Sequence, residues 1–268
     1  MVRIILNADD FGKSSNRNRA INDSFKQGLI CSAGLIVTGK HLNEAVDYIR
    51  EGGYADKVHL HVNLSTNLLQ EDSEDIPITE KMKSDSLFCQ NGKFAPYKGL
   101  PRRLVTIFRW RSVYHEIVAQ YERFMAITDG KGDLTRIDFH LWYNLSWPVS
   151  VALCLFTRKY KIKSVRYVGF HLRRKLRNRV YCAIAKCCNP QVKVIPATNI
   201  DYFISRKEEF DNFDVVELYC HPNYKEGIFL DDSPSYLKHE RQPMMAHFQM
   251  LNKIQDIEFV SWKDISFA

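Results

Sequence analysis

Short apolar runs and amphipathic stretches alternate along most of this chain. The run Val2–Leu6 predicts a buried strand, and the stretch after it carries apolar residues at helical spacing until Gly28, a common helix stop. In order, the first predicted elements are a strand over Val2–Leu6, a helix over Ser14–Gln27, a strand over Ser32–Val37, a helix over His41–Glu51 and a strand over Lys57–Leu64. Such alternation favours parallel strands joined by right-handed crossovers, so the loops that follow the strands are expected to share one end of the fold.

The rest of the chain continues this alternation after a long polar segment. Residues 65–100 hold scattered Gly and Pro and few large apolar residues, which predicts a functional loop or lid. The later predicted elements are a helix over residues 101–128, a strand over Arg136–Leu141, a helix over Val149–Tyr160, a strand over Ser164–Val168, a helix over Leu172–Cys187, strands over Val192–Ile195, Tyr202–Ile204 and Val215–Cys220, a helix over Pro234–Leu251 and a strand over Glu258–Val260. Residues 1–268 are therefore expected to form one α/β domain, a distorted or incomplete (β/α) barrel with about seven parallel strands.

Two adjacent carboxylates, Asp9 and Asp10, stand where the first predicted strand gives way to its loop. Neighbouring residues at a strand end point in different directions, so one carboxylate can hold a metal while the other moves protons. The alternative is that both residues only cap the following helix, because Asp beside Ser14 and Ser15 is common at helix starts. Histidines at the ends of later strands would favour the catalytic interpretation.

Such histidines are present. They are His59 and His61 on the third predicted strand, His140 beside Asp138 on the fourth, and His221 after the strand Val215–Cys220. Asp10, His61 and His140 would offer one carboxylate and two imidazoles, with positions left for water and substrate, which is typical of catalytic metal sites. One divalent ion is expected, Zn²⁺ first, with Mg²⁺, Mn²⁺ and Co²⁺ as alternatives. Because such an ion lowers the pKa of its water to roughly 7, the predicted chemistry is hydrolysis.

The remaining polar residues near this end fill the other roles of a hydrolase. Asp9 is the expected general base, and His221 the expected acid that protonates the leaving group, since an amine leaves poorly as an anion. Arg166 is predicted to orient a carboxylate or stabilise an oxyanion. A surface arginine in a basic stretch is the alternative for Arg166.

Four segments in this order resemble the YdjC-like family of carbohydrate deacetylases, which includes chitooligosaccharide deacetylases. The segments are Asn7-Ala8-Asp9-Asp10-Phe11-Gly12, His61-Val62-Asn63-Leu64-Ser65, Ile137-Asp138-Phe139-His140 and Glu217-Leu218-Tyr219-Cys220-His221-Pro222. The resemblance covers nearly the whole chain and implies a distorted (β/α) barrel that removes acetyl groups from N-acetylated sugars. It also implies these roles: a metal held by Asp10, His61 and His140, Asp9 as the base, His221 in catalysis or substrate contact, and His59 behind the metal or facing the substrate.

The fourth strand departs from the family pattern. Family members usually continue as Asp-Ser-His-x-His-x-His, whereas this chain places Trp142 and Asn144 where the second and third histidines stand. The retained His140 is the one that the metal needs, so the departure is expected to change sugar specificity more than metal binding. Trp142 is predicted to stack on a pyranose face, with a place in the core as the alternative.

The composition narrows the class of protein. At 268 residues and 45% apolar, the chain can bury a large core. The seven cysteines are odd in number and lack CxxC spacing, the chain starts on a strand-like run instead of a leader peptide, and no apolar run reaches membrane-spanning length. We therefore expect a cytoplasmic protein with reduced thiols and no transmembrane segment.

The formal net charge is +7, and the basic excess is concentrated between Arg158 and Arg179. A basic patch attracts polyanions, although a solvated helix face is the commoner explanation. We expect an N-acetylated saccharide as the substrate and no nucleic-acid partner, and an anionic or phosphate-linked sugar is kept as a hypothesis. Peripheral contact with a membrane surface and formation of a homo-oligomer also stay open.

Two rival functions fit parts of the pattern. Metal-dependent phosphoester hydrolysis would use the same ligands and the basic stretch, but such enzymes commonly need a second metal and more carboxylates. A non-catalytic carbohydrate-binding relative would explain the replaced histidines, and the intact Asp9 counts against it.

Overall fold

The structure is a computed structural model that describes residues 1–66, 75–95, 109–140, 147–168, 175–233 and 243–265. Within these residues, seven parallel strands form a ring that closes because the last of them pairs with the first. In ring order the strands are β1 (Val2–Phe11), β2 (Ser32–Leu35), β3 (Val58–Val62), β6 (Asp133–Phe139), β7 (Ser164–Val168), β8 (Lys193–Asn199) and β9 (Val215–Cys220). A further parallel strand, β12 (Ile257–Phe259), pairs with β1. The predicted α/β barrel with about seven parallel strands is confirmed.

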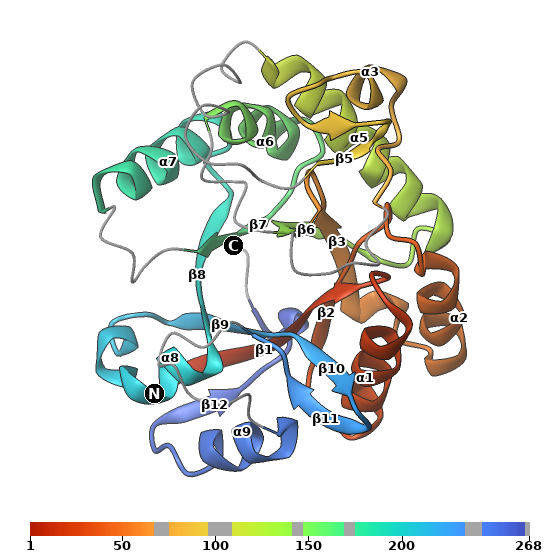
Figure 1. Ribbon diagram of the computed structural model, residues 1–268. Helices are drawn as coiled ribbons and strands as arrows, with labels where there is room; N and C mark the ends of the chain where they lie inside the picture. The colour runs from red at the N-terminus through yellow and green to blue at the C-terminus, as the bar shows by residue number, and fades with distance from the viewer. Residues whose placement is uncertain (67–74, 96–108, 141–146, 169–174, 234–242, 266–268) are drawn as a thin grey trace.

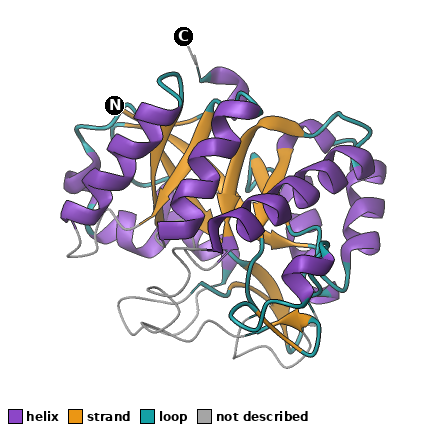
Figure 2. Cartoon of the chain, turned by 90° about the horizontal axis from the view of Figure 1, so that it is seen from above, coloured by secondary structure: helices purple, strands orange, loops and turns teal. Residues whose placement is uncertain are grey.

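Helices surround the ring of strands (Figures 1 and 2). They are α1 (Ser15–Lys26), α2 (Leu42–Gly52), α5 (Trp110–Ile127), α6 (Trp147–Lys159), α7 (Lys175–Cys188), α8 (Ile200–Ser205) and α9 (Met244–Leu251), with 3₁₀ turns at Ala55–Lys57, Lys207–Phe210 and Trp262–Asp264. The hydroxyl of Ser14 accepts from the Arg17 amide and caps α1, as the sequence predicts for a helix start. In the part of the chain described, no helix combines the length and apolar character needed to cross a membrane.

The two faces of β1 show how the barrel separates its core from its site. Val2, Ile4, Leu6 and Ala8 belong to the large apolar core shared with the surrounding helices. Ile5, one step out of phase, belongs to a small separate cluster with Ile195, Val215 and Ile265. Because side chains alternate along a strand, Asn7 and Asp9 lie on the face of Ile5. The inner face of β1 therefore changes from apolar to charged towards the carboxyl end of the strand.

The C-terminal segment covers the other end of the barrel interior. Ile265 and the partly buried Trp262 pack on the small inner cluster around Ile5. The Trp262 ring also lies against the guanidinium of the buried Arg136, with 3.8 Å between the guanidinium carbon and the ring centroid. This contact shields one side of a buried charge, so the barrel interior is closed behind the charged groups of the site.

Two regions differ from the sequence predictions. The strand predicted over Tyr202–Ile204 is wrong, because the Asn199 side chain accepts a hydrogen bond from the Tyr202 amide at 2.8 Å and starts the helix α8 there. An antiparallel hairpin, β10 (Pro222–Lys225) and β11 (Ile228–Asp231), was not predicted and follows β9 directly. In Figure 1 it lies beside α1.

The long polar segment is partly structured where it is described. It contains the short helix α3 (Glu80–Lys83) and a small hairpin of β4 (Cys89–Gln90) and β5 (Lys93–Phe94). Residues 67–74 and 96–108 lie outside the described part, as do residues 234–242, where the start of the last predicted helix falls. The predicted single domain with a lid over residues 65–100 therefore stays a prediction.

Candidate metal centre and active site

The end of β1 is bent so that its two carboxylates point apart. The pairing of β1 with β2 shifts in register between Ala8 and Phe11, and Asp10 adopts a left-handed conformation with a φ of 71°. A residue other than Gly in this region typically costs about 1–3 kcal/mol, a strain that is concentrated at functional sites. The following Gly12 has a φ of +93°, and a Cβ there would lie 2.7 Å from the Ile36 carbonyl oxygen, so the turn requires glycine.

Asp10, His61 and His140 converge from three strand ends on one buried point. One possible ligand atom from each residue lies within 4.8 Å of the others. Asp10 Oδ1 is 2.8 Å from His140 Nδ1 and 3.5 Å from His61 Nε2. This oxygen is buried and receives no well-aligned hydrogen bond from the described residues. An unsatisfied carboxylate oxygen facing two imidazoles fits a divalent ion, and Zn²⁺ accepts this donor set.

Asp138 holds His61 in the orientation that a metal ligand needs. Its Oδ1 is 2.6 Å from His61 Nδ1, which leaves Nε2 directed at Asp10. Burial alone would lower the pKa of His61, but Asp138 and Asp9 raise it to about 10. Carboxylates that bind the outer nitrogen of a ligating histidine commonly fix its tautomer and increase its basicity. A Cβ at Gly34 would lie 3.0 Å from the Cβ of His61, so the small residue on β2 makes room for this ring.

His59 lies behind the candidate ligands, on the inner side of the same strand as His61. Its Nε2 is 2.9 Å from Asp138 Oδ2 and its Nδ1 is 3.3 Å from the Ser32 hydroxyl. The side chain is fully buried, and burial together with the Arg136 charge lowers the pKa of His59. His59 therefore acts on the centre through Asp138.

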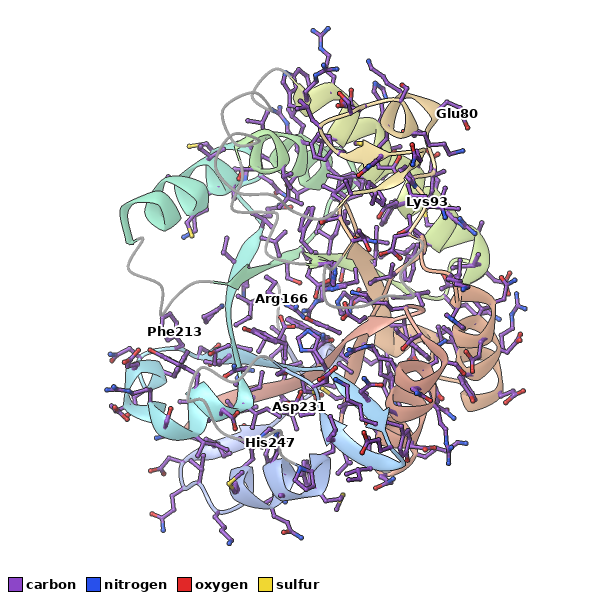
Figure 3. All side chains as sticks on the ribbon, viewed as in Figure 1. Glu80, Lys93, Arg166, Phe213, Asp231 and His247 are labelled. Atoms are coloured by element: carbon purple, nitrogen blue, oxygen red, sulfur yellow. The ribbon has the colours of Figure 1, made fainter. Side chains whose placement is uncertain are left out.

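Arg166 reaches across the barrel to Asp9. Its two terminal nitrogens donate to the two oxygens of Asp9 at 2.5 and 2.7 Å, and Asn7 Nδ2 donates to Asp9 Oδ1 at 2.8 Å. Since β1 and β7 are not neighbours in the ring, this contact crosses the interior, and Figure 3 shows Arg166 near its centre. Burial alone would raise the pKa of Asp9, but Arg166 outweighs it and the pKa lies below its ordinary value. Asp9 is thus a fixed, ionised carboxylate beside the candidate ligands.

The buried charges around Arg166 balance one another. Arg166 also donates to Glu217 at 2.5 Å, and one of its terminal nitrogens lies 2.6 Å from Asp138 Oδ2. Arg136 contacts Glu217 at 2.5 Å and Asp138 at 3.4 Å. Two guanidinium groups therefore neutralise most of the charge of Asp9, Asp138 and Glu217. Asp9, His61 and Asp138 form a second possible ligand group, but its carboxylates already bind Arg166, so Asp10 with His61 and His140 fits an ion better.

Two buried cations face the other oxygen of Asp10. Lys13 Nζ lies 3.7 Å from Asp10 Oδ2 and 2.9 Å from His140 Nε2, and Arg17 lies 3.9 Å from Asp10 Oδ2. Burial lowers the pKa of Lys13, and burial with the Lys13 charge lowers the pKa of His140 to about 4. His140 is therefore neutral at pH 7, the form in which imidazole binds a metal.

His221 stands directly before the β10–β11 hairpin, close to Asp9. Its Nε2 is 3.9 Å from Asp9 Oδ2, and its Nδ1 is 2.9 Å from the Ser233 hydroxyl. Its backbone amide donates to Asp231 Oδ1 at 2.8 Å. The hairpin thus directs this ring towards Asp9.

The structure brings most of the predicted site residues together and adds several that the sequence did not indicate. Those brought together are Asp9, Asp10, His61, His140, Arg166 and His221, with His59 one contact further away. Trp142 lies outside the described residues, as do Arg173 and Arg174 of the basic stretch. Roles for Asp138, Glu217, Lys13 and Ser233 were not predicted. Glu217 carried a signal, since a carboxylate within the apolar strand Val215–Cys220 must find a buried partner.

The comparison with known families agrees with the sequence resemblance. The family model described as YdjC-like protein matches residues 3–253. The chain belongs to the YdjC-like protein family.

Curated relatives and a solved structure extend this result. Carbohydrate deacetylase 2 of Listeria innocua is 24% identical to this YdjC-like protein over 278 residues, which cover 98% of this chain and 99% of the relative. The carbohydrate deacetylase of Clostridium beijerinckii is 22% identical over 270 residues, covering 98% and 97% of the two chains. A crystal structure from Enterococcus faecalis V583, provisionally described as a cellobiose-phosphate cleavage protein, superposes with a TM-score of 0.63 at 20% identity over 84% of this chain and 82% of that one. This likeness shows the shared fold.

Proposed function

We propose that this YdjC-like protein is a metal-dependent carbohydrate deacetylase that removes the N-acetyl group of an N-acetylated sugar and releases acetate. The names of the curated relatives support the deacetylase activity. The observation that carries the proposal is the unsatisfied Asp10 oxygen facing His61 and His140, with the ionised Asp9 beside them. A metal centre next to an ionised carboxylate that can act as the base is an arrangement suited to amide hydrolysis.

Asp10, His61 and His140 would hold the divalent ion, Zn²⁺ by preference. Such an ion supplies Lewis-acid activation of a water molecule and of the acetyl carbonyl. Asp9 takes a proton from the attacking water, because its carboxylate lies next to the candidate ligand His61 while Arg166 and Asn7 fix the carboxylate plane. Pairing with Arg166 makes Asp9 a weak but well-positioned base.

His221 delivers a proton to the leaving nitrogen. Burial lowers the pKa of His221, so the ring is neutral at pH 7 and must gain its proton during the reaction. Asp9 Oδ2 lies 3.9 Å from His221 Nε2 and is the proposed source of this proton. One proton would then pass from water through Asp9 and His221 to the nitrogen, and no net proton is consumed by the protein.

Acetate release tests this proposal. Purified protein is supplied in turn with Zn²⁺, Co²⁺, Mn²⁺ or Mg²⁺ and with chitooligosaccharides, and acetate is measured. The Asp9→Asn variant should keep its bound metal and lose about 10²-fold or more in kcat. Acetate release at the wild-type rate by this variant would reject Asp9 as the base. Binding of chitooligosaccharide without turnover under every metal would favour the non-catalytic carbohydrate-binding alternative.

Phosphoester hydrolysis is the second candidate function, and a specific observation favours it. Lys13 and Arg17 bring two buried cations to within 3.7 and 3.9 Å of Asp10, where they would attract a phosphorylated sugar. The Enterococcus faecalis protein is described in terms of a phosphorylated disaccharide. Assaying phosphate and acetate release from phosphorylated N-acetylated sugars separates the two reactions. Acetate without phosphate would make the sugar phosphate a recognition group. A cytoplasmic location suits such substrates and is part of the proposal.

A further inference from the structure

A continuous path of polar contacts runs from His221 away from the metal centre. His221 Nδ1 is 2.9 Å from the Ser233 hydroxyl, and that hydroxyl donates to Asp231 Oδ1 at 2.6 Å. The other oxygen of Asp231 lies 3.3 Å from His247 Nδ1, and His247 Nε2 lies 2.8 Å from Asp201 Oδ1. The path therefore links the residue that follows β9 to β11, α9 and α8, and Figure 3 labels two of its members, Asp231 and His247.

The middle of this path is buried and carries defined charges. Asp231 and His247 each expose only 2% of their surface, and Ser233 exposes 9%. Burial alone would raise the pKa of Asp231, but His247 and the Ser233 hydroxyl lower it to about 2. Burial alone would lower the pKa of His247, but Asp201 and Asp231 raise it to about 9. At pH 7 the path is therefore an anion, Asp231, held between a hydroxyl and an imidazolium.

The direction of the hydrogen bonds follows from this charge pattern. An ionised Asp231 can only accept, so the Ser233 hydroxyl must give it the proton and has only lone pairs left for His221. His221 Nδ1 must then carry a hydrogen and donate to Ser233. In a neutral ring this leaves Nε2 as an unprotonated acceptor that faces Asp9.

We propose that Ser233, anchored by Asp231 and His247, is a positioning residue that keeps the proton of neutral His221 on Nδ1, so that Nε2 is free to take the proton collected by Asp9. When Nε2 gains that proton, the ring becomes positive, and the hydroxyl and carboxylate behind it stabilise the charge. Passing the proton on to the leaving nitrogen restores the neutral ring. Proton and charge balance at each step, and no other reactant is needed.

Asp231 also stabilises the backbone of the loop that holds His221. Asp231 accepts the backbone amides of His221 and Ser233, at 2.8 and 3.0 Å, and so shapes the loop. Other charged groups also face His221, namely Asp9 and Asp10 from β1 and Arg17 from α1. A useful test must therefore change the Ser233 hydroxyl alone and must read the tautomer of His221 directly.

Nitrogen NMR of ¹⁵N-histidine-labelled protein without metal provides that readout, and it depends on no activity. The His221 signals are identified by their loss in His221→Gln. We expect Nδ1 of wild-type His221 to be protonated and Nε2 to be unprotonated, a mixture of tautomers in Ser233→Ala, and the wild-type pattern again in Ser233→Thr, which keeps the hydroxyl. Ser205→Ala, which removes an exposed hydroxyl on α8, should change nothing. A wild-type ring protonated on Nε2, or an unchanged tautomer in Ser233→Ala, would overturn the proposal.

Steady-state kinetics then connects the tautomer to turnover, and this arm rests on the proposed deacetylase function. Ser233→Ala should lose about tenfold or more in kcat with KM unchanged, and Ser233→Thr should recover most of it. An increase in KM with kcat unchanged in Ser233→Ala would place Ser233 in substrate binding and contradict the positioning role. If no variant, wild type included, releases acetate while the tautomers behave as expected, the deacetylase assignment fails and the positioning of His221 stands.

Discussion

Two histidines, the buried His61 and the partly buried His221, flank Asp9, and their outer nitrogens meet different partners. His61 Nδ1 touches the Asp138 carboxylate directly at 2.6 Å, whereas His221 Nδ1 reaches Asp231 only through the Ser233 hydroxyl. The pKa of His61 is raised to about 10, and the pKa of His221 is lowered. A carboxylate in direct contact favours a positive charge on the ring or an ion beyond it. A hydroxyl in between leaves a neutral ring that can take and give a proton.

The two histidines also differ in how the fold positions them. His61 and its partner Asp138 lie on adjacent barrel strands and are placed opposite each other by the register of β3 and β6. His221 depends on a hairpin that follows β9 and on the short helices α8 and α9. The candidate metal side is thus part of the barrel itself, and the proposed proton side is an addition to its rim.

Removing Arg166 should have the largest effect, because it belongs to the barrel side of this comparison. Arg166→Ala leaves Asp9, Asp138 and Glu217 with one buried guanidinium, and loss of one partner from a buried ion pair typically costs about 3–5 kcal/mol. Urea unfolding measures the change in the free energy of unfolding. Arg158→Ala, which removes an exposed arginine, is the matched control and should change it by less than about 0.5 kcal/mol. Equal effects of the two variants on the free energy of unfolding would show that Arg166 does not stabilise the buried carboxylates that it contacts.

Asp138→Asn tests the candidate metal side apart from the proton side, because it changes the partner of His61 without removing a candidate ligand. The neutral amide introduced by this substitution would no longer supply a negative charge next to His61 Nδ1, so the metal affinity should fall by about 10–100-fold. The tautomer of His221, with its proton on Nδ1, should stay unchanged. Competition with a chromogenic chelator measures the affinity. Asp133→Asn is the matched control on the same strand. The Asp133 carboxylate accepts hydrogen bonds from the nearby Thr135, away from the candidate ligands, so this variant should leave the metal affinity unchanged. Unaltered affinity in Asp138→Asn would show that Asp138 does not support the metal.

The sequence predicted the barrel side far better than the rim. Asp9, Asp10, His61 and His140 could be found because each follows or ends an apolar run, and parallel strands end at one edge. Arg166 was also predicted, but its pairing with Asp9 could not be, since the two residues are 157 positions apart and meet only through the closure of the ring. The pairing depends on strand register across the interior, which local patterns do not encode.

The hairpin at the rim was missed for a local reason. The turn between β10 and β11 uses Glu226 and Gly227 with φ values of 51° and 79°, the left-handed pair that a tight hairpin requires. Asn-Gly or Asp-Gly would have indicated this hairpin, but Glu226 is an unusual residue for the first position. Without the hairpin, nothing in the sequence places Ser233 or Asp231 near His221.

The smallest expected effect is a pH-dependent loss of stability on the rim side, in His247→Gln. The folded pKa of His247, about 9, exceeds the unfolded value near 6.5, so its contribution is fully present below pH 6.5 and is lost as the pH rises through 9. The variant should therefore be less stable than wild type by about 1–2 kcal/mol at pH 6 and by much less at pH 10. Thermal or urea unfolding at the two pH values measures this difference, with the exposed His115→Gln as the matched control. A deficit that is the same at both pH values would show that His247 packs without its charge, and Asp231 would then have to be held by its hydrogen bonds alone.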